Sequence, residues 1–148
     1  MNTVDCSLEG ESFDLRPIEE TAHLVLKHLE LDGVELSILI CNDDFIHVLN
    51  RDYRGKDKPT DVLSFSQREG GFEEDPMLGD VIISLETSSA QAVEHQKALK
   101  DELSLLLVHG ILHLLGYDHE VEEEAEEMEA KEREILSVLH VEWELNSR

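Results

Sequence analysis

The segment from Leu103 to Leu115 constrains this chain more than any other, because it is apolar on nearly every side of a helix. Its polar positions are few, namely Ser104, His109, Gly110 and His113. A helix that is apolar all round must be buried, since none of its faces suits contact with water. The remaining elements must therefore pack around this helix, and the polar side chains that it carries must find partners in the interior.

The flanking segments predict the elements that enclose this helix. Apolar residues at spacings of three and four predict an amphipathic helix over Pro17–Glu30, and a narrow apolar stripe predicts another over Glu120–Leu139. Asp43 or Asp44 is a candidate cap for a short helix through Leu49. Apolar runs predict three strands, at Val34–Ile40, Val62–Phe65 and Gly79–Leu85.

Chain length and the order of these elements predict one domain. A chain of 148 residues with 41% hydrophobic composition can bury well over half of its unfolded surface around a single core. Helices that alternate with strands favour a small α/β (α+β) fold, in which a mixed sheet packs with helices. After the last predicted strand, the pattern becomes helical again from Ser88. We therefore expect a single domain over residues 1–148.

The net charge of −23 counts against a nucleic-acid partner, because phosphate binding depends largely on lysine and arginine. The basic residues are unevenly distributed, however. Five of the 12 gather between residues 51 and 68, at Arg51, Arg54, Lys56, Lys58 and Arg68. The sign of the local charge matters more than the total, so this segment is a candidate surface for an anionic partner.

Export and membrane insertion are not expected. No apolar stretch approaches the roughly 20 residues needed to cross a bilayer, and Met1–Asp5 lacks the basic start and apolar run of a secretory signal. Cys6 and Cys41 lie far apart without a CxxC pair, which argues against a disulfide framework and against a thiolate zinc site. We expect a cytoplasmic protein with no membrane partner.

Three histidines predict a metal site at the end of the buried helix. His109 and His113 are four residues apart, so both imidazoles lie on one face. Gly116 suits the left-handed residue that ends a helix, after which the chain can turn and bring His119 to the same point. Three neutral histidines and a water are a tetrahedral catalytic zinc arrangement. The spacing therefore predicts one Zn²⁺, although other divalent transition metals suit the same ligands.

Two other interpretations of these histidines remain open. His109 and His113 can be core residues that hydrogen-bond to the backbone, although two polar rings in an apolar helix each need a partner. The spacing HxxxHxxGxxH also resembles that of the metzincin proteases, whose motif places a glutamate directly after the first histidine as general base. This chain has Gly110 there, so a divergent metallopeptidase would lack the group that deprotonates the water and is a minor alternative.

Three motifs in one order resemble the YbeY family. They are His109–His119, Leu49–Phe65 and Leu78–Ile83, and the resemblance runs over roughly residues 38 to 136. It implies a bacterial zinc-dependent endoribonuclease that acts on single-stranded RNA, in ribosomal RNA maturation and ribosome quality control. The fold that it implies is a mixed four-stranded sheet with helices, and the fourth strand would come from the segment around Val4.

The resemblance also implies roles for individual residues. The family's zinc ligands fall on the same three histidines, and its functionally important arginine falls on Arg54. We therefore expect Arg54 and His109 to act in catalysis, and Arg54, Lys56 and Lys58 to bind the substrate. The planar fork of an arginine can donate two hydrogen bonds to one phosphate, whereas lysines give contacts to the backbone that do not depend on sequence. Asp118 is a candidate carboxylate for orienting a metal ligand.

The expected reaction is hydrolysis of an RNA phosphodiester by a water whose pKa the zinc lowers to about 7, while Arg54 stabilises negative charge on the phosphoryl oxygens. A surface ion pair with Asp52 or Asp57 is the simpler alternative for Arg54. A ribosome-assembly factor with a mainly structural zinc is the alternative function, in which the acidic surface docks on ribosomal proteins. The three evident ligands favour catalysis, because structural sites usually have four. The expected partner is single-stranded or ribosomal RNA, and no DNA is expected.

Overall fold

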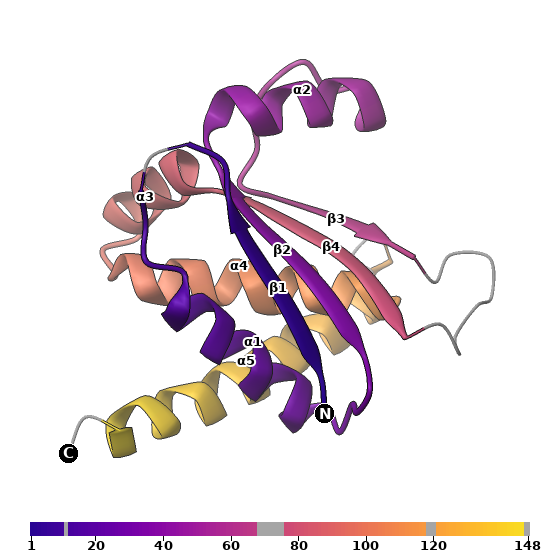
Figure 1. Ribbon diagram of the computed structural model, residues 1–148, viewed down its shortest axis with the longest axis vertical. Helices are drawn as coiled ribbons and strands as arrows, with labels where there is room; N and C mark the ends of the chain where they lie inside the picture. The colour runs from indigo at the N-terminus through magenta and orange to yellow at the C-terminus, as the bar shows by residue number, and fades with distance from the viewer. Residues whose placement is uncertain (11, 68–75, 118–120, 147–148) are drawn as a thin grey trace.

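The structure is a computed structural model that describes residues 1–10, 12–67, 76–117 and 121–146. This part of the chain forms four strands and five helices, whose arrangement is drawn in Figure 1. In chain order they are β1 (Thr3–Leu8), α1 (Arg16–His28), β2 (Glu35–Cys41), α2 (Asp43–Arg54), β3 (Val62–Ser66), β4 (Met77–Ser84), α3 (Leu85–Glu94), α4 (Leu99–Leu114) and α5 (Glu122–Asn146).

The four strands form one mixed sheet in the order β1-β2-β4-β3. β1 pairs in parallel with β2, β2 pairs in parallel with β4, and β3 pairs antiparallel with β4. Val4 of β1 lies opposite Leu36 of β2, which confirms the fourth strand that the resemblance implied. The mixed four-stranded sheet packed with helices is confirmed as well.

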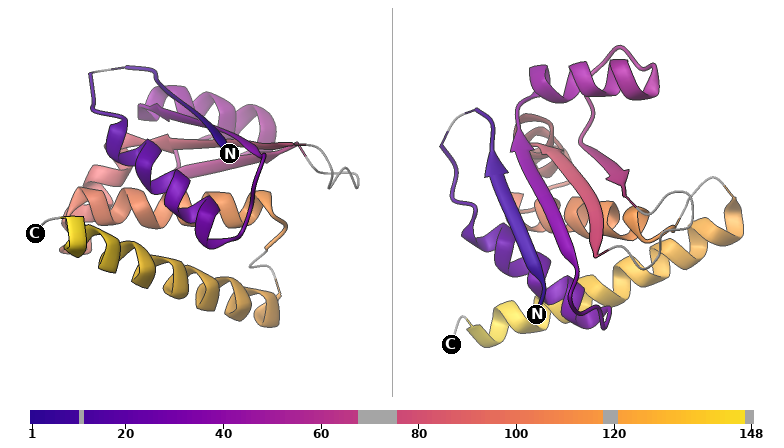
Figure 2. Two further views of the ribbon diagram at one scale, coloured as in Figure 1. Left: turned by 60° about the horizontal axis from the view of Figure 1, so that its bottom comes forward. Right: turned by 45° about the vertical axis from the view of Figure 1, so that its right-hand side comes forward.

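Helices cover the two faces of this sheet unequally. α1, α4 and α5 lie on one face, and α2 lies on the other (Figure 2). The larger core therefore includes α4, whose residues Leu107, Val108, Ile111 and Leu112 are at most 1% exposed. The smaller core joins Ile46 of α2 to the opposite face of the sheet. The prediction that the apolar helix must be buried is confirmed.

The start and the end of α2 differ from the prediction. Neither Asp43 nor Asp44 is the cap, because the side chain of Asn42 accepts a hydrogen bond from the backbone N–H of Phe45 at 2.9 Å. The helix also continues past Leu49 to Arg54 and ends at Gly55, which has a φ of +69° and whose N–H donates to the carbonyl of Arg51. Arg54 is consequently fixed at the end of a helix rather than in a loop.

The chain after β4 forms two helices before α5. α3 begins at Leu85 rather than at Ser88, because the hydroxyl of Ser84 caps it by accepting from the N–H of Thr87 at 3.3 Å. Leu85 was predicted to end a strand and instead starts this helix. Val121 of the predicted stripe precedes α5 and is exposed, whereas Met128, Ile135 and Leu139 of α5 are buried against the core.

No helix in the described part of the chain is both long and apolar enough to span a bilayer.

Candidate metal centre

His109 and His113 lie one turn apart on the C-terminal half of α4, and their rings converge. Their Nε2 atoms are 3.0 Å apart, and the ring planes meet at 78°. Two nitrogens that bind one tetrahedral zinc at 2.0–2.1 Å lie about 3.3 Å from each other. A shift of a few tenths of an ångström would therefore place both nitrogens in the positions of two zinc ligands.

The third predicted ligand, His119, lies outside the described residues, as does Asp118. The turn that leads toward it is described as far as Tyr117. Gly116 has a φ of +99°, which favours glycine, and the N–H of Tyr117 donates to the carbonyl of Leu112 at 3.1 Å. Among the residues that the structure describes, no three histidine, cysteine or acidic side chains are grouped to hold a metal. The full ligand set therefore stays a prediction.

A carboxylate that the sequence did not predict contacts the first histidine. Oε1 of Glu132 lies 2.6 Å from Nδ1 of His109, and the Glu132 side chain is only 14% exposed. The sequence did hold a signal for it, because Glu132 lies four residues after Met128 and three before Ile135, on the buried face of α5. This spacing does not single out Glu132 in the sequence, because α5 carries many glutamates, most of which are exposed.

A groove of about 600 Å³ opens beside the two histidines. Arg54, at the end of α2, lines the same groove, and β3 lies between α2 and α4 along it. Its described lining consists of Arg54, Thr60, Asp61, Val62, Leu63, Ser64, Phe65, Ser66, His109, His113, Leu114, Gly116 and Tyr117. The structure therefore brings together three of the predicted site residues from two helices, Arg54 of α2 and the two histidines of α4.

Arg54 is exposed, and the two aspartates considered as its partners have other partners. Asp52 pairs with Arg51 at 3.0 Å, and Asp57 pairs with His47 at 2.7 Å. Within the described ranges, no ion pair joins Arg54 to either aspartate. The surface ion pair that was the alternative for Arg54 is therefore not formed, and Arg54 is one of the residues that line the groove.

Lys56 and Lys58 are exposed and follow Arg54 on the loop to β3, but neither is among the described residues that line the groove. The buried Asn50 positions this loop. Its side-chain Nδ2 donates to the backbone carbonyl of Lys58 at 2.9 Å, and its backbone carbonyl accepts from the N–H of Lys56 at 3.2 Å. The lysines are thus held beside the groove rather than inside it. Arg68, the last of the basic cluster, lies outside the described residues.

Gly110, the position of the metzincin glutamate, has no room for a side chain. A Cβ atom there would lie 2.7 Å from Cγ1 of Val81, which is closer than real Cβ atoms approach. The helix also bonds to β3 at this point, because the hydroxyl of Ser64 donates to the carbonyl of Gly110 at 3.0 Å. α4 therefore packs on the sheet at the residue where a peptidase needs its general base, which argues further against a metallopeptidase.

The two cysteines are free thiols with raised pKa values. Burial and then the charges of Glu19 and Asp5 raise the pKa of Cys6 to about 11. Burial, followed by nearby acidic groups, raises the pKa of Cys41 to about 12. Raised pKa values keep both thiols protonated at neutral pH, so neither is an activated nucleophile.

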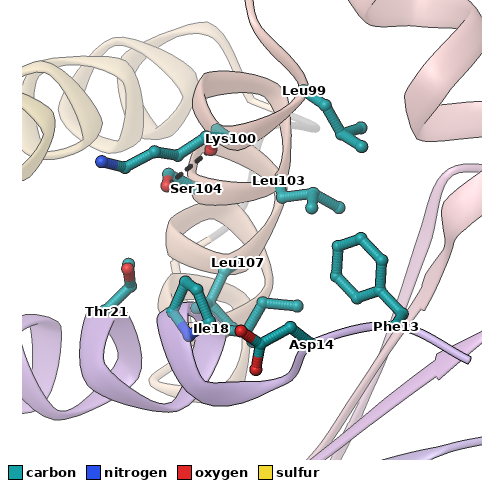
Figure 3. Close-up of a pocket in the computed structure, with 10 residues that line it drawn as sticks. Phe13, Asp14, Ile18, Thr21, Leu99, Lys100, Leu103, Ser104 and Leu107 are labelled. Carbon is teal, nitrogen blue, oxygen red and sulfur yellow. Dashed lines mark hydrogen bonds between the residues drawn. The ribbon is translucent and has the colours of Figure 1, made fainter.

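A second hollow of about 180 Å³ lies at the other end of α4, between that end and the start of α1 (Figure 3). Figure 3 shows Phe13, Ile18, Leu103 and Leu107 around it, with Asp14 at its edge. Asp14 is paired with Arg16 at 3.1 Å. This hollow is apolar and has no histidine in its lining, so it does not resemble the groove chemically.

The chain is similar to one family and to its members over most of its length. The model of the family described as Endoribonuclease YbeY matches residues 6–140. The Endoribonuclease YbeY of Bacillus subtilis strain 168 is 43% identical over 145 residues, which cover 90% of this chain and 92% of that protein. The Endoribonuclease YbeY of Pelotomaculum thermopropionicum is 51% identical over 114 residues, covering 74% of this chain and 75% of that protein.

A solved structure agrees in fold. The solution structure of TM1509 from Thermotoga maritima superimposes with a TM-score of 0.67 at 27% identity and covers 95% of this chain and 93% of that one. The chloroplastic Endoribonuclease YBEY of Arabidopsis thaliana is 49% identical over 106 residues, covering 71% of this chain but only 18% of that longer protein.

Proposed function

The chain belongs to the YbeY family, and we propose that it is a metal-dependent endoribonuclease that cleaves single-stranded RNA in the groove beside α4. One observation carries this proposal. Arg54 and the converging pair His109 and His113 line the same groove, although they come from different helices. An arginine and a histidine pair that suits a metal ion, lining one groove, fit a phosphodiester, which has negative oxygens to hold and a bond to hydrolyse.

The proposed cofactor is one zinc ion, with His109, His113 and His119 as ligands. The Nε2 atoms of the first two, 3.0 Å apart, support this assignment. Bound there, zinc would supply a water of lowered pKa and a positive charge next to the scissile phosphate. His109 is thus a catalytic residue in the sense that it holds the ion at the reacting atoms.

Arg54 acts on the substrate from the end of α2, where it lines the same groove. Its guanidinium donates two parallel hydrogen bonds to phosphoryl oxygens and stabilises the negative charge that develops on them. The helix end that carries Arg54 is fixed, because the N–H of Gly55 donates to the carbonyl of Arg51 at 3.1 Å. Lys56 and Lys58 contact phosphates farther along the strand, which adds affinity that does not depend on sequence.

Aromatic side chains beside the groove favour an unpaired substrate. Phe65 lines the groove and meets Tyr53 in an edge contact with ring centroids 5.4 Å apart. Tyr53 is 71% exposed, so its face is accessible to a ligand. Bases stack on such rings only when they are free of a duplex, because in a helix their faces are covered by neighbouring bases.

In the cell we propose a role in ribosomal RNA maturation, with ribosomal proteins as partners. The support is the net charge of −23 and the exposed glutamates of α5, which suit basic protein surfaces. The alternative of an assembly factor with a structural zinc requires a fourth protein ligand. Among the residues that the structure describes, no further histidine, cysteine or acidic side chain is grouped with His109 and His113 to serve as that ligand.

The proposal is tested by cleavage of one RNA in two forms. Purified protein is incubated with a single-stranded RNA and with the same RNA annealed to its complement, with chelator, and with zinc restored after the chelator. We expect zinc-dependent cleavage of the single strand, loss of cleavage in His113→Ala, and wild-type cleavage in His23→Ala, which changes an exposed histidine on α1. Cleavage that persists in chelator and in His113→Ala would contradict the proposal.

A further inference from the structure

The contact between α5 and the metal centre carries an inference beyond the proposed reaction. We infer that Glu132 is a positioning residue. It holds the ring of His109 with the hydrogen on Nδ1 and with the unprotonated Nε2 directed at the proposed metal position between His109 and His113. The inference rests on the proposed metal site, and it deepens that proposal by adding a residue outside the ligand set.

The geometry fixes the direction of the hydrogen bond. An ionised carboxylate only accepts, so the 2.6 Å contact requires that Nδ1 of His109 donates to Oε1 of Glu132. In a neutral imidazole the other nitrogen then has a lone pair. That nitrogen, Nε2, is the atom that lies 3.0 Å from Nε2 of His113. Glu132 therefore selects the form of His109 that can bind a metal at Nε2.

The packing of α5 fixes the position of Glu132. Met128 and Ile135, one turn to either side, are at most 1% exposed and anchor the helix in the core. Glu134 adds a contact to α1, with Oε2 lying 2.7 Å from Nε2 of His28. The Glu132 side chain is 14% exposed, whereas Glu129 on the same helix is exposed to solvent. The packing of Met128 and Ile135 in the core therefore holds Glu132 in the interior.

Glu132 is distinct from the ligands themselves. It contacts the nitrogen of His109 that faces away from His113, and it does not form a metal-binding group with these two histidines in the part of the chain that the structure describes. A carboxylate behind a metal-binding histidine fixes the ring and raises its basicity, and its loss typically lowers metal affinity roughly 10- to 100-fold.

The experiment compares three variants with the wild-type chain. Glu132→Ala removes the acceptor, Glu132→Gln keeps an acceptor oxygen without the charge, and Glu129→Ala makes the same change in net charge on the exposed face of α5. Zinc affinity is measured by competition with a chromogenic chelator. The tautomer of His109 is measured in metal-free, ¹⁵N-labelled protein by NMR, and thermal unfolding followed by circular dichroism reports whether each variant is folded.

We expect Glu132→Ala to weaken zinc binding roughly 10- to 100-fold, Glu132→Gln to fall between it and the wild type, and Glu129→Ala to bind as the wild type does. His109 in the wild type should be protonated at Nδ1, and Glu132→Ala should lose this preference. Wild-type zinc affinity in Glu132→Ala, an equal loss in Glu129→Ala, or wild-type His109 protonated only at Nε2 would each overturn the inference. A wild-type chain that binds no zinc would instead contradict the proposed function, and the NMR result would still decide the role of Glu132.

Discussion

The two halves of α4 border two hollows of opposite character, although both halves belong to the same buried helix. The N-terminal half places Leu99 and Leu103 against an apolar hollow of about 180 Å³. The C-terminal half places His109 and His113 beside a polar groove of about 600 Å³. Burial alone therefore does not define the site. What differs is the partners, since the polar rings of the second half meet a carboxylate from α5 and share their groove with an arginine from α2.

Removal of the His113 imidazole should produce the largest difference in effect between substitutions in the two halves of α4. His113→Ala deletes a proposed ligand, so we expect loss of bound zinc and of RNA cleavage by more than the roughly 100-fold that loss of a supporting residue produces. Leu103→Ala, in the other half, should lower the free energy of unfolding by about 2–5 kcal/mol and leave the zinc content unchanged. Metal analysis and chemical denaturation measure the two effects. Unchanged zinc in His113→Ala would remove the distinction.

Substitution of Arg54 tests whether the part of the groove formed by α2 takes part in the chemistry. Arg54→Ala should reduce kcat by roughly 10²- to 10³-fold, because it removes a donor to the charge that develops in the transition state. RNA affinity should fall much less. The control is Arg51→Ala, three residues earlier on α2, where the arginine is paired with Asp52. Equal losses of turnover and affinity in Arg54→Ala would reject the transition-state role.

Small residues in the two halves should respond differently to substitution. Gly110→Ala places a methyl group 2.7 Å from Cγ1 of Val81, and we expect this overpacking to destabilise the chain by about 1–3 kcal/mol. Ser104→Ala removes a hydroxyl that donates to the carbonyl of Lys100 at 2.8 Å beside the apolar hollow, so its effect should stay under about 1.5 kcal/mol. Urea denaturation measures both. A Gly110→Ala chain as stable as the wild type would show that α4 can move away from the sheet.

The smallest expected effect concerns the lysines beside the groove. Replacing Lys56 or Lys58 by Ala should weaken binding of single-stranded RNA equally for different sequences. Each change should reduce the slope of log affinity against log salt by about 0.7. Fluorescence anisotropy at several salt concentrations measures this slope. A change in sequence preference, or an unchanged slope, would show that these lysines do not contact phosphates.

The sequence predicted α4 and its histidines because both depend on local spacing. Leu103–Leu115 is apolar around the whole helix, and two histidines four residues apart must share a face. The strand around Val4 was different, since its short amphipathic pattern was recognisable only through the family resemblance. Its pairing with β2 depends on residues far away in the chain.

Other features depend on tertiary packing, and the sequence could not supply them. The position of Arg54 at the groove depends on how α2, which extends to that residue, lies relative to β3 and α4. The role of Glu132 depends on which glutamate of α5 the core turns inward. The lack of space at Gly110 depends on how closely α4 approaches Val81. Each of these three features depends on the distances between helices and strands, which a knowledge of the helices and strands alone does not give.

The proposed metal centre is tested most directly by X-ray absorption spectroscopy of the zinc-loaded protein, combined with metal analysis. We predict one zinc per chain with three imidazole nitrogens at 2.0–2.1 Å and one further oxygen from solvent. Loss of one imidazole in His119→Ala should be visible in the same spectrum. Sulfur in the coordination sphere, fewer than three imidazoles, or a fourth ligand from the protein would contradict a catalytic zinc held by His109, His113 and His119.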